Sequence, residues 1–320
     1  MKTAGQPNGS PALCVGLALG SGSARGWAHI GVIRALQAAG VEPDVVCGAS
    51  VGALVGGAYV SGELDAFEAW VRGLSGWDVV RLLDVRLLGG GLIEGERLMA
   101  FIRQYVAEGP IEELPRRFAA IATDLESGRE LWLQRGSLLQ AVRASLALPG
   151  LFPPARMGER WLVDGGLVNP VPISLCRALG AEVVIAVNLN GDIVGKHQPP
   201  PGAVARQRRN KGKADQHTPL EQLMTRFNAG LKLGLPATLT GAQDGPAEAP
   251  GLVSVLMSSI NIMQDRITRS RMAGDPPDVH LVPRMGHLGM LDFHRAEECI
   301  QEGASCVERS LPVLKGLLRP

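Results

Sequence analysis

Continuous apolar runs alternate with amphipathic segments over the first part of the chain. The run Leu13–Leu19 is apolar throughout, which is typical of a strand buried on both faces of a parallel sheet. A loop rich in glycine and serine follows, and Trp27–Ala39 then carries apolar residues at helical spacing before Gly40 ends the pattern. Val41–Cys47 repeats the strand pattern and Ser50–Val60 the helical one. These segments predict two consecutive βα units.

The same two patterns predict the remaining elements. From Glu63 to Gly109 the periodicity is helical, interrupted by the glycine run at 89–91, which we interpret as a mobile joint. Further strands are predicted at Phe118–Thr123, Arg129–Gln134, Arg160–Val163 and finally Val183–Leu189, and further helices at Leu138–Ala147, Leu252–Met272 and Arg295–Leu318. This order favours a three-layer α/β domain with a mainly parallel central sheet between helices.

Three stretches do not follow these patterns. Residues 191–219 contain three consecutive prolines and a cluster of arginines and lysines with little to bury, so we expect a disordered insertion there. Residues 236–250 form a second loose segment, and residues 1–12 are polar and predict a flexible N-terminus. We find no internal repeat, and we expect one domain over 13–320.

Composition narrows the class of protein. Hydrophobic residues make up 46% of the 320 residues, which is enough for a sizeable core. The net charge of +1 gives no global field that would attract nucleic acid. The five cysteines lack metal-ligand spacing and are odd in number, which indicates reduced thiols in a cytoplasmic protein. We find no run of about 18 apolar residues, so we expect any membrane contact to be peripheral.

The segment 48–52, with the sequence Gly-Ala-Ser-Val-Gly, has the context of a nucleophilic serine between a strand and a helix. Gly48 and Gly52 permit the tight bend, and the bend places the Ser50 hydroxyl at a helix N-terminus, where backbone amides and the helix dipole favour negative charge. The motif alone is a weak signal, because ordinary turns also use glycine and serine. The glycine loop, residues 20–26 after the first strand, strengthens this signal, because its backbone amides could bind an oxyanion.

A serine nucleophile needs a base, and the residues alone leave two choices open. The first is a histidine in a Ser, Asp, His triad, for which His280, His287 and His294 are the candidates. His29, on the first helix, more simply has a structural role.

The second choice is a carboxylate, Asp164, which directly follows a predicted strand and is followed by Gly165 and Gly166. A carboxylate acts as a base at neutral pH when apolar surroundings raise its pKa. We expect the preceding residues 161–163 (Trp-Leu-Val) to provide those surroundings.

Three blocks of sequence together resemble the bacterial patatin-like phospholipases, the family that includes plant patatins and the catalytic part of neuropathy target esterase. The blocks are LALGSGSARGWAHIGVI at 17–33, GASVGALVGGAY at 48–59 and WLVDGGLVNPVPI at 161–173. With their connecting pieces they cover most of residues 13–189. The resemblance implies a patatin-like α/β/α fold and a lipid acyl hydrolase of the phospholipase A or lysophospholipase type, working through an acyl-enzyme without a metal or organic cofactor.

The family uses a Ser-Asp dyad without histidine, which the resemblance places on Ser50 as nucleophile and Asp164 as general base. Its oxyanion hole comes from amides of the glycine loop, here Gly22 and Ser23, with Arg25 as the arginine of that loop. The family commonly has three consecutive glycines, whereas this chain has serines on both sides of Gly22. Backbone donors tolerate that change unless the loop requires a positive φ.

Other residues of these segments have simpler interpretations. We expect Asp124 to cap the turn after its strand rather than act as a second acid. We expect Asn169 to hold the Asp-Gly-Gly loop in shape and Cys47 to pack in the core. The glycine loop fails as a dinucleotide site, because the G-x-G-x-x-G spacing requires glycine where the chain has Arg25.

Two other functions are compatible with the same residues. An acyltransferase would pass the acyl group from Ser50 to an acceptor other than water, and an inactive module would only bind lipid or fatty acid. The basic and then amphipathic segment 206–231 suggests docking on anionic lipid, which would bring a cytoplasmic protein to the inner face of the membrane. The sequence leaves the oligomeric state open, with a homodimer among the choices.

Overall fold

The computed structural model describes residues 13–78, 96–106, 108–193 and 252–317. Several predicted segments lie outside the described residues: the N-terminus at 1–12, the glycine run at 89–91, the insertion beyond position 193, the basic segment 206–231 and the loose segment 236–250.

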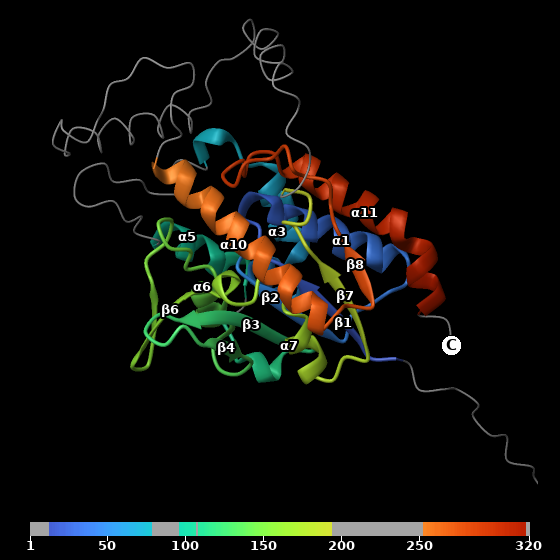
Figure 1. Cartoon of the computed structure of the whole chain (residues 1–320), viewed down its shortest axis with the longest axis horizontal. Coiled ribbons are helices and arrows are strands. Elements are labelled where there is room, and N and C mark those ends of the chain that lie inside the picture. The colour runs from blue at the N-terminus through green and yellow to red at the C-terminus, as the bar shows by residue number, and fades with distance from the viewer. Residues whose placement is uncertain (1–12, 79–95, 107, 194–251, 318–320) are drawn as a thin grey trace, which may run out of the picture.

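One sheet of eight strands lies at the centre of the described part of the chain (Figure 1). Its strands are β1 (Val15–Leu19), β2 (Val45–Ala49), β3 (Arg117–Asp124), β4 (Glu130–Leu133), β5 (Ala155–Met157), β6 (Arg160–Asp164), β7 (Val183–Val187) and β8 (Val279–Leu281). Their order is β5-β6-β3-β2-β1-β7-β8, with β4 also paired to β3. The neighbouring strands β3, β2, β1, β7 and β8 are parallel to one another. Strands β4 and β6 pair with β3 in the antiparallel direction, and β5 pairs with β6 in the same way.

Helices flank this sheet on both faces (Figure 1). They are α1 (Ala28–Ala38), α2 (Val51–Val60), α3 (Leu64–Arg72), α5 (Glu96–Tyr105), α6 (Leu138–Ser145), α7 (Ile173–Ala178), α10 (Leu252–Gly274) and α11 (Ala296–Leu317). Three short 3₁₀ turns, η1 (Ser23–Trp27), η2 (Ile111–Glu113) and η3 (Gly165–Leu167), lie between them.

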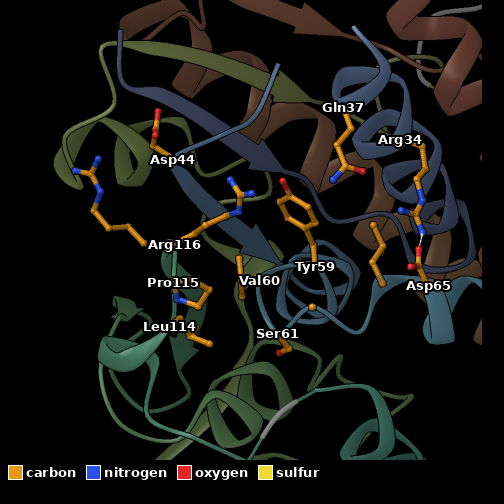
Figure 2. A pocket seen from close by; sticks show the side chains of 13 residues that line it. Arg34, Gln37, Asp44, Tyr59, Val60, Ser61, Asp65, Leu114, Pro115 and Arg116 are labelled. Atoms are coloured by element: carbon orange, nitrogen blue, oxygen red, sulfur yellow. Dashed lines mark hydrogen bonds and ion pairs between the residues drawn. The ribbon is translucent and has the colours of Figure 1, made fainter. Parts of the chain in front are cut away.

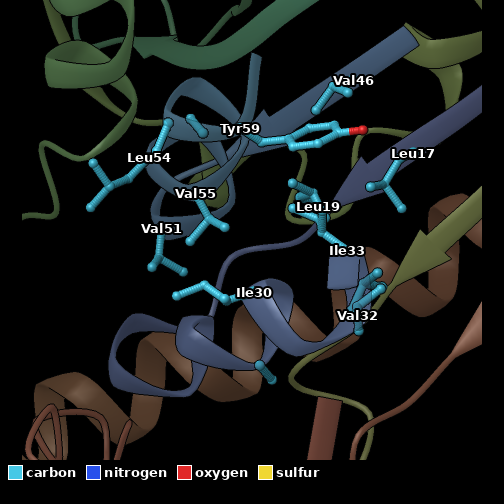
Figure 3. Packing of buried hydrophobic residues seen from close by; sticks show 14 of the residues in the cluster. Leu17, Leu19, Ile30, Val32, Ile33, Val46, Val51, Leu54, Val55 and Tyr59 are labelled. Atoms are coloured by element: carbon cyan, nitrogen blue, oxygen red, sulfur yellow. The ribbon is translucent and has the colours of Figure 1, made fainter. Parts of the chain in front are cut away.

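Alternate residues of β1 face the two helical layers. Leu17 and Leu19 belong to the larger buried cluster, which also contains Ile30 and Ile33 of α1 and residues of α2 (Figure 3). Ala18, between the two leucines, belongs to a second buried cluster shared with α7. Because successive strand side chains point to opposite faces, this division makes the domain a three-layer α/β/α fold.

Strand β3 brings two distant chain segments together at one edge. Ala120 pairs with Gly48 of β2 and with Leu133 of β4, and Ala122 pairs with Asp164 of β6 and with a residue of β4. Strand β4 therefore takes one edge of β3, while β2 and then β6 share the other edge. Since β2 is parallel to β3 and β6 is antiparallel to it, the C-terminal ends of β2 and β6 meet.

The predicted fold class is confirmed, and the main differences concern short elements. The prediction that Val183–Leu189 is the last strand is wrong, because β8 follows it in the chain. Strands β5 and β8 have three residues each and α7 has six, which is too short for a periodic signal. Trp27 ends the turn η1 rather than opening the first helix.

Among the described residues, no helix combines the length and the apolar character needed to cross a membrane.

Candidate active site

Ser50 lies in a strained turn between β2 and α2. Its backbone has a φ of 56° and a ψ of −125°, a conformation that costs of order 1–3 kcal/mol for a residue other than glycine. Glycine is required on both sides: a Cβ at Gly52 would lie 2.1 Å from the Leu19 carbonyl oxygen, and one at Gly48 would lie 2.4 Å from the Ala53 Cα. The turn therefore has the geometry that the Gly-x-Ser-x-Gly pattern predicts.

The amide of Ser50 is held by a residue that the sequence patterns do not single out. Ser145, at the end of α6, is completely buried, and its Oγ accepts a 2.9 Å hydrogen bond from the Ser50 amide. A serine on the buried face of a predicted helix is the only sequence signal for this role. The contact fixes the strained turn from outside the β2–α2 unit.

The side chain of Ser50 donates to Asp164. Its Oγ lies 2.5 Å from Asp164 Oδ2, and Asp164 has no exposed surface. The other carboxylate oxygen, Oδ1, accepts a 2.7 Å hydrogen bond from the Gly166 amide. The backbone of Asp164 is fixed as well, because its carbonyl accepts from the Thr123 hydroxyl at 2.8 Å and its amide donates to Ala147 at 2.9 Å.

Burial sets the acidity of this carboxyl group. Desolvation raises the pKa of Asp164 from its ordinary value of 3.8 to about 7, although the hydrogen bonds from Ser50 and Gly166 oppose the shift. Leu162 and Val163 are buried next to it, but Trp161 is 50% exposed. The expectation that Trp161 shields Asp164 is therefore wrong, since half of the Trp161 side chain is exposed to solvent.

The glycine loop has two amides without an acceptor in the described part of the chain, those of Gly22 and Ser23. The neighbouring amides are occupied: Ser21 donates to Pro170, and Ala24 donates to Met290. Ser23 has a φ of 52°, so the loop does require a positive φ at a position where this chain has serine instead of glycine. The backbone adopts the loop conformation in spite of that strain.

Arg25 supports the glycine loop through hydrogen bonds of its buried side chain. Its side chain is 1% exposed, and it donates to the carbonyl of Gly22 at 3.2 Å and to Asn261 Oδ1 of α10 at 3.0 Å. Desolvation lowers the pKa of Arg25 to about 10, so the guanidinium is still charged at neutral pH. By holding the Gly22 carbonyl, Arg25 also fixes the direction of the Ser23 amide, which belongs to the same peptide unit.

A second group of polar side chains joins α10 to the Asp164 loop. A Cβ at Gly166 would lie 2.6 Å from Gln264 Nε2, 2.7 Å from Ser21 Oγ and 3.0 Å from Asp164 Oδ1. Gln264 is 3% exposed and accepts a 3.0 Å hydrogen bond from the Asn190 side chain. Gln264, Asn190 and Asn261 carry no recognisable signal in the sequence, because polar residues within a long helix or after a strand resemble ordinary surface positions.

The remaining candidates lie apart from Ser50. No hydrogen bond joins a histidine of the described residues to Ser50 or Asp164; His287 instead pairs with Glu298 at 2.6 Å, and His29 contacts the Gly20 carbonyl at 2.7 Å. Asp124 accepts from two amides of the following turn, as expected for a cap. Those amides, the Ser127 amide above all, hold the pKa of Asp124 below its ordinary value.

Two further expectations concern Asn169 and the cysteines. The Asn169 amide donates to the Gly165 carbonyl at 3.0 Å and its side chain donates to Glu130 at 2.9 Å, so it does brace the Asp-Gly-Gly loop. Cys47 is buried beside Cys176, and all five cysteines are free thiols. Burial raises the pKa of Cys47, which fits a packing role.

A separate cavity of about 880 Å³ lies at the opposite ends of the strands, beside the N-terminal ends of β2 and β3. It is lined by Asp44 and Arg117, at the N-terminal ends of β2 and β3, and by Tyr59 and Arg116 (Figure 2). Ser50 follows the C-terminal end of β2, so this cavity does not contain the Ser50–Asp164 pair.

Comparison with known proteins identifies the family to which these motifs belong. Residues 17–177 match the family model of the patatin-like phospholipases. An uncharacterized NTE family protein of Mycobacterium tuberculosis is 33% identical over 95% of this chain and 92% of its own length. The chain belongs to the patatin-like phospholipase family. Membership of this family supports a lipid hydrolase as the class of protein.

More distant members of the patatin-like phospholipase group also align. The lysophospholipase NTE1 of Coccidioides immitis is 28% identical over 94% of this chain but only 18% of its own length. A patatin-like phospholipase domain-containing protein of Caenorhabditis elegans is 36% identical over 55% of this chain and 13% of its own length. The family domain of this chain is therefore similar to one part of these larger proteins.

Proposed function

We propose that this protein is a serine acyl hydrolase that cleaves carboxylic ester bonds of lipids with a Ser50–Asp164 dyad. The observation that carries the proposal is the 2.5 Å hydrogen bond from the Ser50 hydroxyl to a completely buried carboxylate. A serine hydroxyl becomes a useful nucleophile when a positioned base takes its proton, and Asp164, with a pKa raised to about 7, is matched to that task at neutral pH.

The proposed reaction begins as Ser50 Oγ attacks the ester carbonyl carbon and its proton passes to Asp164 Oδ2. The carbonyl oxygen becomes an oxyanion, which accepts from the free Gly22 and Ser23 amides near the N-terminus of α2. Collapse of this intermediate breaks the bond to the alcohol, which leaves with the proton from Asp164. The acyl group stays on Ser50 as an ester.

Water then completes the cycle in the proposed mechanism. Asp164 takes a proton from a water molecule as its oxygen attacks the acyl-enzyme. Ser50 leaves and recovers the proton, and the fatty acid is released. No step requires a metal or an organic cofactor, because the pair supplies both the nucleophile and the proton transfers.

The test is labelling by a fluorophosphonate together with ester hydrolysis. We expect Ser50→Ala to lose both, and Asp164→Asn to lose hydrolysis, while the matched controls Ser310→Ala and Asp124→Asn keep them. Labelling that persists in Ser50→Ala would overturn the proposal. Loss of activity in a folded His280→Ala, His287→Ala or His294→Ala protein would replace the dyad with a triad.

A panel of phospholipids, lysophospholipids and simple acyl esters then separates phospholipase A from lysophospholipase activity. Product analysis with an alcohol acceptor separates hydrolysis from acyl transfer, because both share the acyl-enzyme. Fatty-acid binding without turnover on any ester would indicate a binding module.

We also propose peripheral contact with anionic membranes through residues 206–231, on the basis of their basic and amphipathic sequence. Deleting these residues should weaken sedimentation with anionic vesicles while leaving hydrolysis of a soluble ester unchanged. Equal vesicle binding by the two proteins would remove this part of the proposal.

A further inference from the structure

A cavity of about 490 Å³ lies between α5 and α6, which pack side by side (Figure 1). Its lining includes Met99 and Arg103 of α5, and Leu139, Gln140 and Arg143 of α6. The Ser50–Asp164 pair is not part of this lining. The proposed hydrolysis therefore assigns no role to this cavity.

Arg143 brings a partly buried positive charge to the cavity without a counter-ion. One nitrogen of its guanidinium, Nη2, donates to the Pro153 carbonyl at 2.8 Å. The other, Nη1, is buried and has no hydrogen-bond partner among the described residues. Desolvation lowers the pKa of Arg143, and no carboxylate of the described residues opposes that shift. Because a buried cation is costly unless it is paired, Arg143 favours an anion in the cavity.

The other charged side chains around the cavity leave this positive charge uncompensated. Arg103 and Glu108 both belong to the lining and pair with each other at 3.4 Å. Glu112, outside the lining, accepts a 2.8 Å hydrogen bond from the Gly136 amide. The charged residues of the lining are thus two arginines and one glutamate, and the charge that stays unpaired is that of Arg143.

The first turn of α6 adds a backbone donor at the same cavity. The Leu138 amide donates to the Gly109 carbonyl at 3.0 Å. The Gln140 amide donates to Oγ of the N-cap residue Ser137 at 3.3 Å. The amide of Leu139, between them, has no acceptor in the described part of the chain. Free amides at a helix N-terminus favour negative charge, and phosphate groups accept from them readily.

The free amide and the free guanidinium nitrogen belong to one side of the helix. Arg143 follows Leu139 by four residues, or about one turn, and helical side chains lean toward the N-terminus. Both residues line the same cavity. The two unpaired donors are therefore available to one ligand.

We propose that this cavity binds a phosphate group, which accepts from Nη1 of Arg143 and from the Leu139 amide. A tetrahedral phosphate has oxygens that accept from both directions, and it supplies the negative charge that Arg143 lacks. The cavity has room for more than the phosphate, and Met99 and Pro110 offer apolar contacts to the rest of the ligand. The ligand is thus a phosphate ester, either a small molecule or the head group of a lipid.

Calorimetric titration with glycerol 3-phosphate tests the site. We expect binding to the wild type and an affinity at least about tenfold lower for Arg143→Gln, which loses a charged hydrogen bond. Gln140→Glu adds a negative charge to the lining and should also weaken binding. Gln37→Glu makes the same change on α1, outside this lining, and should leave the affinity unchanged.

Thermal unfolding separates folding from binding. Because a ligand stabilises the folded state that binds it, glycerol 3-phosphate should raise the Tm of the wild type more than that of the two cavity variants. If Arg143→Gln does not fold without its bond to Pro153, Gln140→Glu still tests the site, since Gln140 is exposed. No binding to the wild type, or equal affinities in the wild type and the folded cavity variants, would overturn the proposal. Equally tight binding of acetate would overturn the choice of phosphate.

Vesicles that contain phosphatidic acid distinguish the two sources of the phosphate. Weaker sedimentation of Arg143→Gln and Gln140→Glu with these vesicles would assign a lipid head group. Equal sedimentation, with the calorimetric differences retained, would assign a soluble phosphate ester. The inference goes beyond the proposed function and needs no hydrolysis, so Ser50→Ala should bind glycerol 3-phosphate as the wild type does. Loss of binding in Ser50→Ala would overturn a site separate from Ser50.

Discussion

Ser50 and Asp164 are joined by a 2.5 Å hydrogen bond at a point where the carboxylate has no contact with solvent. If Asp164 is the base, it must be ionised to accept the serine proton, and burial raises its pKa to about 7. We expect kcat/KM for a soluble ester to rise about tenfold per pH unit below this value and to level off above it. A pH profile between 5 and 9 measures this, and a kcat/KM that stays level down to pH 5 would contradict a desolvated base.

The same shift makes Asp164 a source of pH-dependent stability. Its pKa is higher in the folded than in the unfolded chain, so its stabilising contribution is present below about pH 4 and is lost as the pH rises through about 7. Relative to Asp164→Asn, the wild type should therefore lose up to about 4 kcal/mol of unfolding free energy over that range. Urea denaturation at several pH values gives the difference.

Asp124→Asn is the matched control for this stability experiment. The pKa of Asp124 is lowered by the turn amides, so its contribution is present above the unfolded pKa and is lost as the pH falls through the folded one. The two variants should therefore differ from the wild type with opposite pH trends. Parallel trends would contradict the burial of Asp164.

Gly52 should tolerate no side chain. A Cβ there would meet backbone, 2.1 Å from the Leu19 carbonyl oxygen, whereas one at Gly56 on the same helix would meet the side chains of Val46 and Leu19 at 3.2 and 3.3 Å. We expect Gly52→Ala to lose about 3 kcal/mol or more, and Gly56→Ala to stay within about 1 kcal/mol, because alanine favours helix. Chemical denaturation of both variants decides this, and equal stabilities would contradict the close packing of α2 on β1.

Ser23 carries strain that glycine would relieve. Its φ of 52° costs roughly 1–2 kcal/mol for a residue with a side chain. Glycine removes this cost, but it also raises the conformational entropy of the unfolded chain, which offsets part of the gain in stability. We expect Ser23→Gly to be more stable than the wild type by about 0.5–1 kcal/mol. Ser23→Ala keeps the strain and serves as the control. A glycine variant less stable than the alanine variant would contradict the positive φ.

The long elements of the fold were predictable from sequence because their patterns are local. The apolar runs at β1, β2, β3 and β7 each continue long enough to mark a strand buried on both faces. Strand β8 has three residues with a burial pattern that any short segment can match, and it exists because β7 offers it an open edge. Only the assembled sheet determines such a strand.

At the site, the sequence determined the two chemical groups and their local turns. Glycines on both sides of Ser50 and after Asp164 are required by backbone contacts within a few ångströms, and such requirements leave a mark in the local sequence. The tertiary structure decided that the two groups meet, because β2 and β6 share one edge of β3 with their C-terminal ends together.

The tertiary structure also decided the acidity of Asp164 and the supports supplied by Ser145, Asn261 and Gln264. A pKa depends on how much water and charge surround a group, and those neighbours come from segments far apart in the chain. Burial is a property of the whole packed domain, so no local pattern around Asp164 could determine it.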